Sequence, residues 1–385
     1  MRSTADAAAD AAFLALCAVI RPEDWRGQEE ALARLDAASW RRVAAHAGYH
    51  GFAGLVSRNL DWACERSGVA IPVAEELRAS RRRVLAQNLA RKAAARQMAA
   101  ALECRDIPFI ALKGVVLAEE TYGDLSLRST NDFDVMVPHE AVEAAFQVAL
   151  DLGYELASLS HIREYVQYGA HAADMVRRDG MGVDLHWTIA PDLPPSAAQI
   201  VWGTCVPAPQ GTGLGGMRLS PELALIHLAA HFHTHQYKFL KPLVDFYFAA
   251  RTATTIEPRL LAETANRLKL TNVLAIAAML GRRSFGAHCL AMLPEDRKRS
   301  WHMLAAATVV SQQMLLNAGD KPRVDNWLRY LFAAGGLGFM AQAAIDTLLP
   351  GRLVVAKYFR APFRPALYPK YYWRQLLKAL TLSNK

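Results

Sequence analysis

The sequence lacks the features that would place it outside the globular proteins. Its five cysteines are scattered and form no Cys-x-x-Cys pair, which argues against a disulfide framework and a cysteine zinc site and favours a reducing cytoplasm. Glycine and proline are close to average abundance, so collagen-like and low-complexity chains are excluded. With 52% apolar and 21% charged residues over 385 positions, the composition is that of a protein with a large core.

The sequence also lacks a long hydrophobic run. The longest apolar stretch, residues 330–345, holds three glycines and is shorter than the roughly 20 residues that cross a bilayer. At the amino terminus, Asp6 and Asp10 precede an apolar run of only ten residues, 11–20, unlike an export signal. We therefore expect no membrane-spanning helix and a cytoplasmic protein.

Acidic residues are missing from the carboxy-terminal tail, residues 351–385. The tail has eight Lys and Arg residues; since the whole chain has 44 Lys and Arg and 36 Asp and Glu, the rest carries no net charge. The tail also contains seven aromatic residues: Tyr358, Phe359, Phe363, Tyr368, Tyr371, Tyr372 and Trp373. Cations among aromatics suit an anionic membrane surface, which would hold the protein peripherally at the inner membrane. They also suit nucleic acid, but nothing else in the chain favours a nucleic-acid partner. The alternative is a solvated tail whose aromatic residues fold back on the core.

Hydrophobic periodicity divides the rest of the chain into three regions. Residues 1–104 and 219–350 have the period of helices, whereas the central region, 105–218, mixes short apolar strands with helices. The strands are predicted at 109–112, 133–137, 172–178 and 182–187, and helices at 72–104, 115–122, 141–152, 273–280 and 303–316, with another capped by Ser220. The predicted fold is α+β, a small mixed sheet flanked by amino- and carboxy-terminal helical regions.

Two predicted strands carry aspartates. Asp132 and Asp134 are two residues apart, so on a strand both carboxylates point to one face while Phe133 enters the core. Adjacent carboxylates repel each other and need a compensating cation, and hard oxygen ligands select Mg²⁺ or Mn²⁺. Asp184 on a neighbouring strand would complete a two-metal site, in which ions about 3.5–4 Å apart clamp the attacking and leaving oxygens of phosphoryl transfer.

These residues belong to a longer ordered set: Leu112-Lys113-Gly114, Tyr122, Arg128, Asp132-Phe133-Asp134, Gly153-Tyr154 and Asp184-Leu185-His186-Trp187. The set resembles the nucleotidyltransferase superfamily, which has the fold of DNA polymerase beta. Within that superfamily it is similar to the largely uncharacterised bacterial nucleotidyltransferase family proteins. The resemblance covers about residues 105–245.

The resemblance implies roles by position. Gly114 matches the turn glycine where the backbone approaches the triphosphate, and Asp132 and Asp134 match the metal ligands. Asp184 matches the third carboxylate, which helps to deprotonate the acceptor hydroxyl. The superfamily usually has Gly-Ser at the turn where this chain has Lys113 and Gly114.

Two cations are therefore candidates for phosphate contacts. Lys113 can replace the serine because a point charge suits phosphate, and Arg128 can hold phosphate in a forked grip. The resemblance implies a metal-dependent enzyme that moves a nucleoside monophosphate from a nucleoside triphosphate to an acceptor, with pyrophosphate leaving. The acceptor would be a small molecule, a glycan or a peptide.

A run of histidines follows at residues 227–235. His227, His231 and His235 are spaced four apart, so they share one face of the helix that begins near Pro221, and His233 lies among them. This geometry can bind zinc, although the acid that a helical zinc hydrolase places between paired histidines is absent. The other interpretations are buried histidines with satisfied hydrogen bonds, or a substrate contact in which His231 faces the active cleft.

Other interpretations remain open for the aspartates and for the function. Taken singly, Asp132 can be a turn acid, Asp134 can pair with Arg128, and Asp184 can pair with Arg177. The same metal site also suits a kinase-like phosphotransferase that attacks the terminal phosphate. A third possibility is a catalytically inactive membrane-surface adaptor that acts through residues 351–385.

Overall fold

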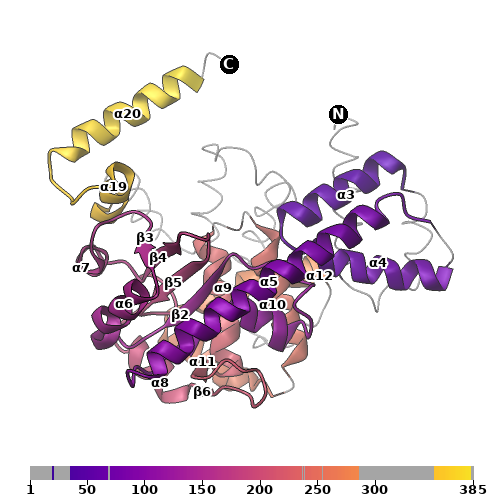
Figure 1. The fold of residues 1–385 in the computed structure, drawn as a ribbon, viewed down its shortest axis with the longest axis horizontal. Helices are drawn as coiled ribbons and strands as arrows, with labels where there is room; N and C mark the ends of the chain where they lie inside the picture. Colours follow the sequence, from indigo (N-terminus) through magenta and orange to yellow (C-terminus); the bar gives the residue numbers. More distant parts are fainter. Residues whose placement is uncertain are drawn as a thin grey trace.

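The computed structural model describes residue 20 and residues 35–67, 70–235, 237, 239–253, 255–285 and 351–382. The fold is α+β, with a small mixed sheet between helical regions, as predicted (Figure 1). The helix predicted at 303–316 and the apolar stretch 330–345 lie outside the described residues. Within the described ranges, no helix combines the length and apolar character needed to cross a membrane.

The described part of the amino-terminal region contains the helices α3 (Ala37–Tyr49), α4 (Ala53–Ser67) and α5 (Ala74–Glu103). Asp36 caps α3 by accepting a hydrogen bond of 2.7 Å from the backbone N–H of Ser39. The long helix predicted at 72–104 is α5, which runs across the molecule from α4 to the sheet (Figure 1). It therefore connects the helical region with the strands.

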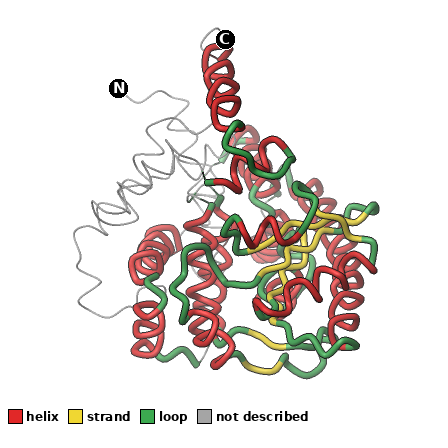
Figure 2. The backbone as a smooth tube through the Cα atoms, turned by 90° about the vertical axis from the view of Figure 1, so that its left-hand side faces the viewer, coloured by secondary structure: helices red, strands yellow, loops and turns green. Residues whose placement is uncertain are grey.

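The sheet has seven strands in the order β3-β4-β5-β2-β1-β7-β6. Their bounds are β1 Ile110–Ala111, β2 Asp132–Met136, β3 Tyr154–Leu156, β4 Ala172–Arg177, β5 Gly182–His186, β6 Val206–Pro207 and β7 Met217–Arg218. The four predicted strands are β1, β2, β4 and β5, and β4 and β5 form an antiparallel hairpin around Asp179 and Gly180. Figure 2 shows the strands in yellow among the helices, and β2 and β5 form a parallel pair near the middle of the strand order.

Further helices lie between and after the strands. A short π-helix, η2 (Leu117–Thr121), follows β1 within the helix predicted at 115–122, and a 3₁₀ turn, η3 (His139–Ala141), leads into α6. The α-helices are α6 Val142–Asp151, α7 Ile162–Gln167, α8 Ala197–Thr204, α9 Pro221–Thr234, α10 Leu240–Thr252, α11 Pro258–Arg267 and α12 Thr271–Phe285. As predicted, the Ser220 side chain caps α9, which has proline at its first position.

The alternation of side chains along β2 determines which way the aspartates face. Phe133 and Val135 enter a core formed with α6 and the end of α5. Met136 enters the other core, formed with the helices of both terminal regions. Because alternate residues of a strand point to opposite faces, Asp132 and Asp134 share the face of Met136, toward α9 and α10.

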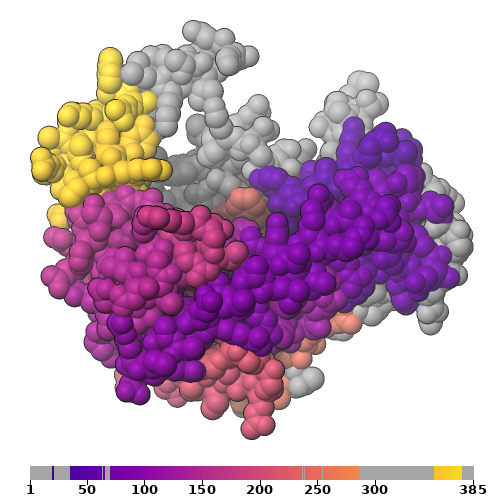
Figure 3. Space-filling model, viewed as in Figure 1, coloured from indigo at the N-terminus to yellow at the C-terminus, as the bar shows by residue number. Residues whose placement is uncertain are grey.

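The tail forms two helices, α19 (Arg352–Phe359) and α20 (Leu367–Leu382). Val355 and Ala356 of α19 are buried, and the Lys357 ammonium lies 2.7 Å from the carboxylate of Asp174. The backbone N–H of Phe363 donates to the Tyr168 hydroxyl at 2.9 Å. The first tail helix is thus anchored on the sheet region, and α20 extends away from it (Figures 1 and 3).

Candidate active site

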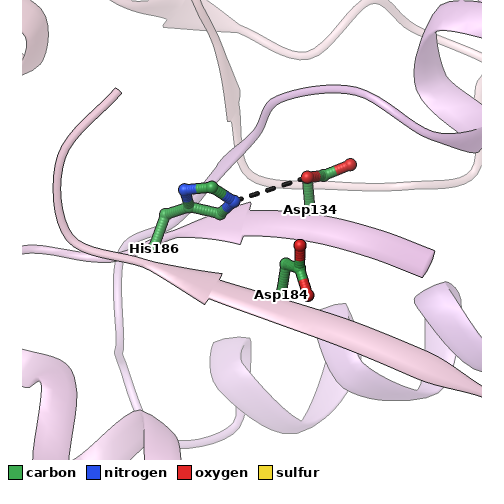
Figure 4. Close-up of side chains that lie close together, drawn as sticks. All are labelled: Asp134, Asp184 and His186. Atoms are coloured by element: carbon green, nitrogen blue, oxygen red, sulfur yellow. Dashed lines mark hydrogen bonds and ion pairs between the residues drawn. The ribbon is translucent and has the colours of Figure 1, made fainter. Parts of the chain in front are cut away.

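The centre of the site is the register of the two parallel strands. Asp134 of β2 lies directly opposite Asp184 of β5. His186, two residues after Asp184, points to the same side of the sheet, and its Nε2 lies 3.4 Å from Asp134 Oδ1 (Figure 4). One ligand atom from each of these three residues lies within 4.8 Å of the other two. The three side chains therefore present two oxygens and a nitrogen to one small volume.

Lys113 lies at the same carboxylate. Its ammonium donates to Asp134 Oδ1 at 2.8 Å and to His231 Nδ1 at 3.1 Å. Both Lys113 and Asp134 are buried. The lysine that the sequence assigned to phosphate thus forms a buried ion pair with a predicted metal ligand.

The three aspartates differ in pKa because their surroundings differ. Burial and the charges of Asp134 and Asp132 raise the pKa of Asp184 to about 8. Burial and Asp134 also raise the pKa of Asp132. Burial opposes ionisation of Asp134 as well, but Lys113 and the hydrogen bond from His186 outweigh it and hold that pKa well below its usual value. Asp134 is therefore the carboxylate that remains ionised. Its negative charge disfavours ionisation of Asp132 and Asp184.

Gly114 brings the turn after β1 against β2. Its φ is +67°, and a Cβ added there would lie 2.7 Å from the Asp132 carbonyl oxygen and 3.9 Å from Asp134 Oδ2. A side chain would meet both steric and conformational resistance at this position. Glycine lets the backbone approach the carboxylates, which is the geometry that the predicted role requires.

Arg128 is held by a carboxylate from the carboxy-terminal helices. Its Nε and Nη2 donate to the two oxygens of Asp245 at 2.7 and 2.8 Å, and its Nη1 donates to the Gly114 carbonyl at 3.2 Å. The Tyr122 hydroxyl donates to the same Asp245 at 2.7 Å. The forked face predicted to grip phosphate is thus occupied by Asp245, and Arg128 supports the glycine turn.

The loop before β2 is held by α5. The Asn88 amide donates to the carbonyls of Leu125 and Arg128, each at 2.7 Å. Its oxygen accepts from the backbone and hydroxyl of Thr130. One buried asparagine therefore fixes both ends of a segment that leads directly into Asp132.

Helices form the wall of the site opposite the sheet. A cavity of about 440 Å³ extends from the carboxylates to the junction of α3 and α4 and to the start of α10. Its wall on the helical side includes His231 of α9, His235 directly after α9, and Phe239, Lys241 and Asp245 in and just before α10. Tyr49, at the end of α3, stacks on Phe239 with ring centroids 6.1 Å apart.

The histidines on α9 share a face, as predicted, and His231 lies in the cavity wall. The ring centroids of His231 and His235 are 4.4 Å apart, and the pKa of His231 is well below its usual value because of burial and Lys113. The His227 ring is hydrogen-bonded to the Ile189 carbonyl at 2.8 Å, and burial with Lys113 lowers its pKa to about 3. Among the described residues, this histidine face is not part of a group that could hold a metal ion.

The predicted residues Lys113, Gly114, Arg128, Asp132, Asp134, Asp184 and His231 all line the cavity. The alternative pairings of the aspartates are wrong, because Arg128 pairs with Asp245 and Arg177 pairs with Asp179. The sequence analysis missed His186 as a ligand candidate, although the period of two that linked Asp132 with Asp134 also links Asp184 with His186. It missed Lys241 too, for which the linear sequence offers no comparable signal.

A divalent ion fits the donor set of Asp134, Asp184 and His186. Their ligand atoms are close enough to share one ion; the two carboxylates suit Mg²⁺ or Mn²⁺, and the imidazole adds a nitrogen donor of the kind that transition metals accept. Asp132 lies outside this group of three but lines the same cavity. The three aspartates predicted as metal ligands thus have an additional candidate ligand beside them, the imidazole of His186.

Fold and site together define a class. A mixed sheet that presents carboxylates from adjacent strands beside a glycine turn has the arrangement of a nucleotidyltransferase. The chain belongs to the family described as "Uncharacterised nucleotidyltransferase", whose model matches residues 36–286, and this confirms the predicted resemblance to an uncharacterised nucleotidyltransferase family.

A comparison with curated proteins finds no match. Among solved structures, an antigenic nucleotidyltransferase-like protein from Paracoccidioides brasiliensis is 19% identical, with a TM-score of 0.31. The alignment covers 49% of this chain and 91% of that one.

Proposed function

We propose that the protein is a metal-dependent nucleotidyltransferase that moves a nucleoside monophosphate from a nucleoside triphosphate to an acceptor. The observation that carries this proposal is the register of Asp134 against Asp184, with His186 beside them and Gly114 at the adjoining turn. Family membership supports it independently. The acceptor class is a small molecule, a glycan or a peptide, and the donor would bind as its Mg²⁺ or Mn²⁺ complex.

In this proposal Asp134, Asp184 and His186 hold one divalent ion, and Asp132 serves a second. Such ions, when bound, neutralise charge on the α-phosphate and on the leaving oxygen. The acceptor oxygen forms a bond to the α-phosphorus while the bond from that phosphorus to the α–β bridging oxygen breaks. Pyrophosphate leaves with that oxygen, and the acceptor proton passes to the Asp184 carboxylate.

The surroundings of each residue support these roles. Burial and the charges of Asp134 and Asp132 raise the pKa of Asp184 to about 8, and a divalent ion bound here would offset that repulsion, so that the Asp184 carboxylate could ionise and accept the proton. Gly114 lets the triphosphate approach the backbone, and Lys113 holds Asp134 in position. Arg128 is assigned to support of the turn, because Asp245 occupies its forked face.

The test is product mass spectrometry. Purified protein is incubated with Mn²⁺ or Mg²⁺, each nucleoside triphosphate and an extract of the host cell. We expect an acceptor that gains the mass of a nucleoside monophosphate, and we expect loss of this product in Asp134→Asn and Asp184→Asn variants. A product that gains only one phosphate would instead indicate the kinase-like reaction, and full turnover in the double variant would end the catalytic proposal.

We propose in addition that the tail binds an anionic membrane surface. The observation that favours it is a set of exposed residues at the start of α20 and in the turn before it: Arg364, Lys370, Tyr372, Trp373 and Arg374, with Trp373 61% exposed. Rings that enter the headgroup layer and cations that pair with anionic lipid are the two parts of interfacial binding.

Co-sedimentation tests the tail. We expect the protein to pellet with vesicles that contain anionic lipid and not with neutral vesicles, and Lys370→Glu/Arg374→Glu to abolish pelleting. Arg82→Glu/Arg83→Glu on α5 makes the same charge change elsewhere and serves as the control. Equal pelleting of the two double variants would contradict the proposal.

A further inference from the structure

The cavity is lined by three Lys and Arg side chains among the described residues: Lys113, Arg128 and Lys241. The first two are already engaged by carboxylates, Lys113 by Asp134 and Arg128 by Asp245. Lys241 makes no hydrogen bond or ion pair with any residue in the described part of the chain. It is therefore the cation left available to a ligand in this wall of the cavity.

The position of Lys241 is defined by close packing. It lies in the first turn of α10, and its side chain runs along the backbone of Gly51. A Cβ added at residue 51 would lie 3.3 Å from Lys241 Cδ and 3.6 Å from Nζ. Gly51 is in turn fixed by its carbonyl, which accepts from the backbone N–H of Ser129 at 2.8 Å. Three segments distant in sequence thus direct one ammonium into the cavity.

The ammonium is held in an environment that disfavours its charge. Burial and the nearby Arg128 lower the pKa of Lys241 to about 8, although Asp245, Asp132 and Asp134 oppose the shift. At neutral pH the group is still mostly protonated. Lys241 is half-buried, and a half-buried cation that makes no ion pair with the described residues around it would gain from an anionic ligand in the cavity.

We propose that Lys241 binds the β- and γ-phosphates of the nucleoside triphosphate, and hence the pyrophosphate that leaves. The inference deepens the proposed function and rests on it for the identity of the donor. In this arrangement the strands supply the metal ligands near the α-phosphate. Lys241 of the carboxy-terminal helices supplies a positive charge that stabilises the departing pyrophosphate. Substrate therefore bridges the two walls of the cavity.

Calorimetric titration with inorganic pyrophosphate, in the presence of Mg²⁺, tests the proposal. We expect Lys241→Gln to weaken binding by roughly tenfold to a hundredfold, as loss of a charge-assisted hydrogen bond does. Lys241→Arg keeps the charge and should retain most of the affinity. Lys269→Gln removes an exposed lysine on the surface and should have no effect.

A pH series separates the charge of Lys241 from its packing. As pH rises from 7 through 8 to 9.5, the wild-type ammonium loses its proton, so its affinity for pyrophosphate should fall relative to that of Lys241→Arg. Protonation of pyrophosphate itself affects both proteins equally and cancels in the ratio. The ionisable groups that face Lys241 are Arg128, Asp245, Asp132 and Asp134, and they are the same in both proteins.

The outcomes distinguish this inference from the proposed function. If wild type fails to bind pyrophosphate, or if Lys241→Gln binds it as well as wild type does, the inference is overturned whatever the enzyme's activity. If binding depends on Lys241 but no nucleoside monophosphate is ever transferred, the inference stands and the proposed function fails. Thermal unfolding of each variant checks that the fold is retained.

Discussion

At the scale of single residues, the turn after β1 depends on glycine. Gly114→Ala would have to keep a φ of +67° and place a methyl group 2.7 Å from the Asp132 carbonyl oxygen. We expect it to lower the free energy of unfolding by about 2–4 kcal/mol, since backbone strain adds to steric overlap. Urea denaturation measures this change.

The matched control for this prediction is Gly123→Ala. Gly123 has a similar φ of +72°, but nothing lies within 4 Å of the added Cβ. It should therefore cost about 1 kcal/mol, the conformational part alone. Equal losses at the two glycines would show that the approach of Gly114 to Asp132 does not matter.

The residues of the site were unequally visible in the sequence. Asp132, Asp134 and Asp184 could be predicted because a strand repeats every two residues and because acids side by side are unusual. His186 obeys the same period and was overlooked only because it is not an acid. Lys241 could not be predicted, because it joins the site through a contact with Gly51 that no local pattern encodes.

At the scale of elements, α5 positions the loop before β2 through one buried side chain. Asn88→Ala would leave the carbonyls of Leu125 and Arg128, and the N–H of Thr130, without this partner. We expect a loss of about 2–4 kcal/mol in the free energy of unfolding, because unsatisfied buried polar groups are costly.

Amide hydrogen exchange shows which backbone segments of the Asn88→Ala variant lose protection. We expect faster exchange of the amides between residues 124 and 131 than in wild type, with little change in α6. Gln87→Ala, an exposed neighbour on the same helix, is the control and should leave both unchanged. Unchanged exchange across this loop in the Asn88 variant would contradict a positioning role for α5.

Sequence periodicity predicted the long helix and the central strands well, because each has a repeating apolar pattern. It did not predict β3, β6 and β7, which have only two or three residues each and owe their conformation to pairing with neighbours. Periodicity also says nothing of the tertiary contacts of α5: Arg81 donates to Ser126 and Asp124, and Arg91 donates to the Asn131 carbonyl. Tertiary partners of a charged helix face are not visible in its own sequence.

At the scale of the whole molecule, the Arg128–Asp245 pair joins the sheet region to the carboxy-terminal helices. Both side chains are buried, so Asp245→Ala would leave an uncompensated guanidinium and deprive Tyr122 of its acceptor. We expect a loss of about 3–5 kcal/mol in the free energy of unfolding.

A double-mutant cycle checks this prediction. Arg128→Met combined with Asp245→Leu removes both charges, so it should be less destabilising than the sum of the two single changes. Strictly additive losses would show that the two side chains do not stabilise each other. Denaturant titration of the four proteins gives the coupling energy directly.

The hydrophobic core is not divided at the boundaries between the regions 1–104, 105–218 and 219–350 that were predicted from hydrophobic periodicity. One apolar cluster includes Trp40 of α3, Met136 of β2 and Phe246 of α10, so it draws on all three regions before the tail. A fragment that ends near residue 218 would expose the sheet face that carries Asp134 and remove Lys241 altogether. Gene fusions or domain swaps within this family should therefore exchange the span from about residue 35 to residue 285 as one unit.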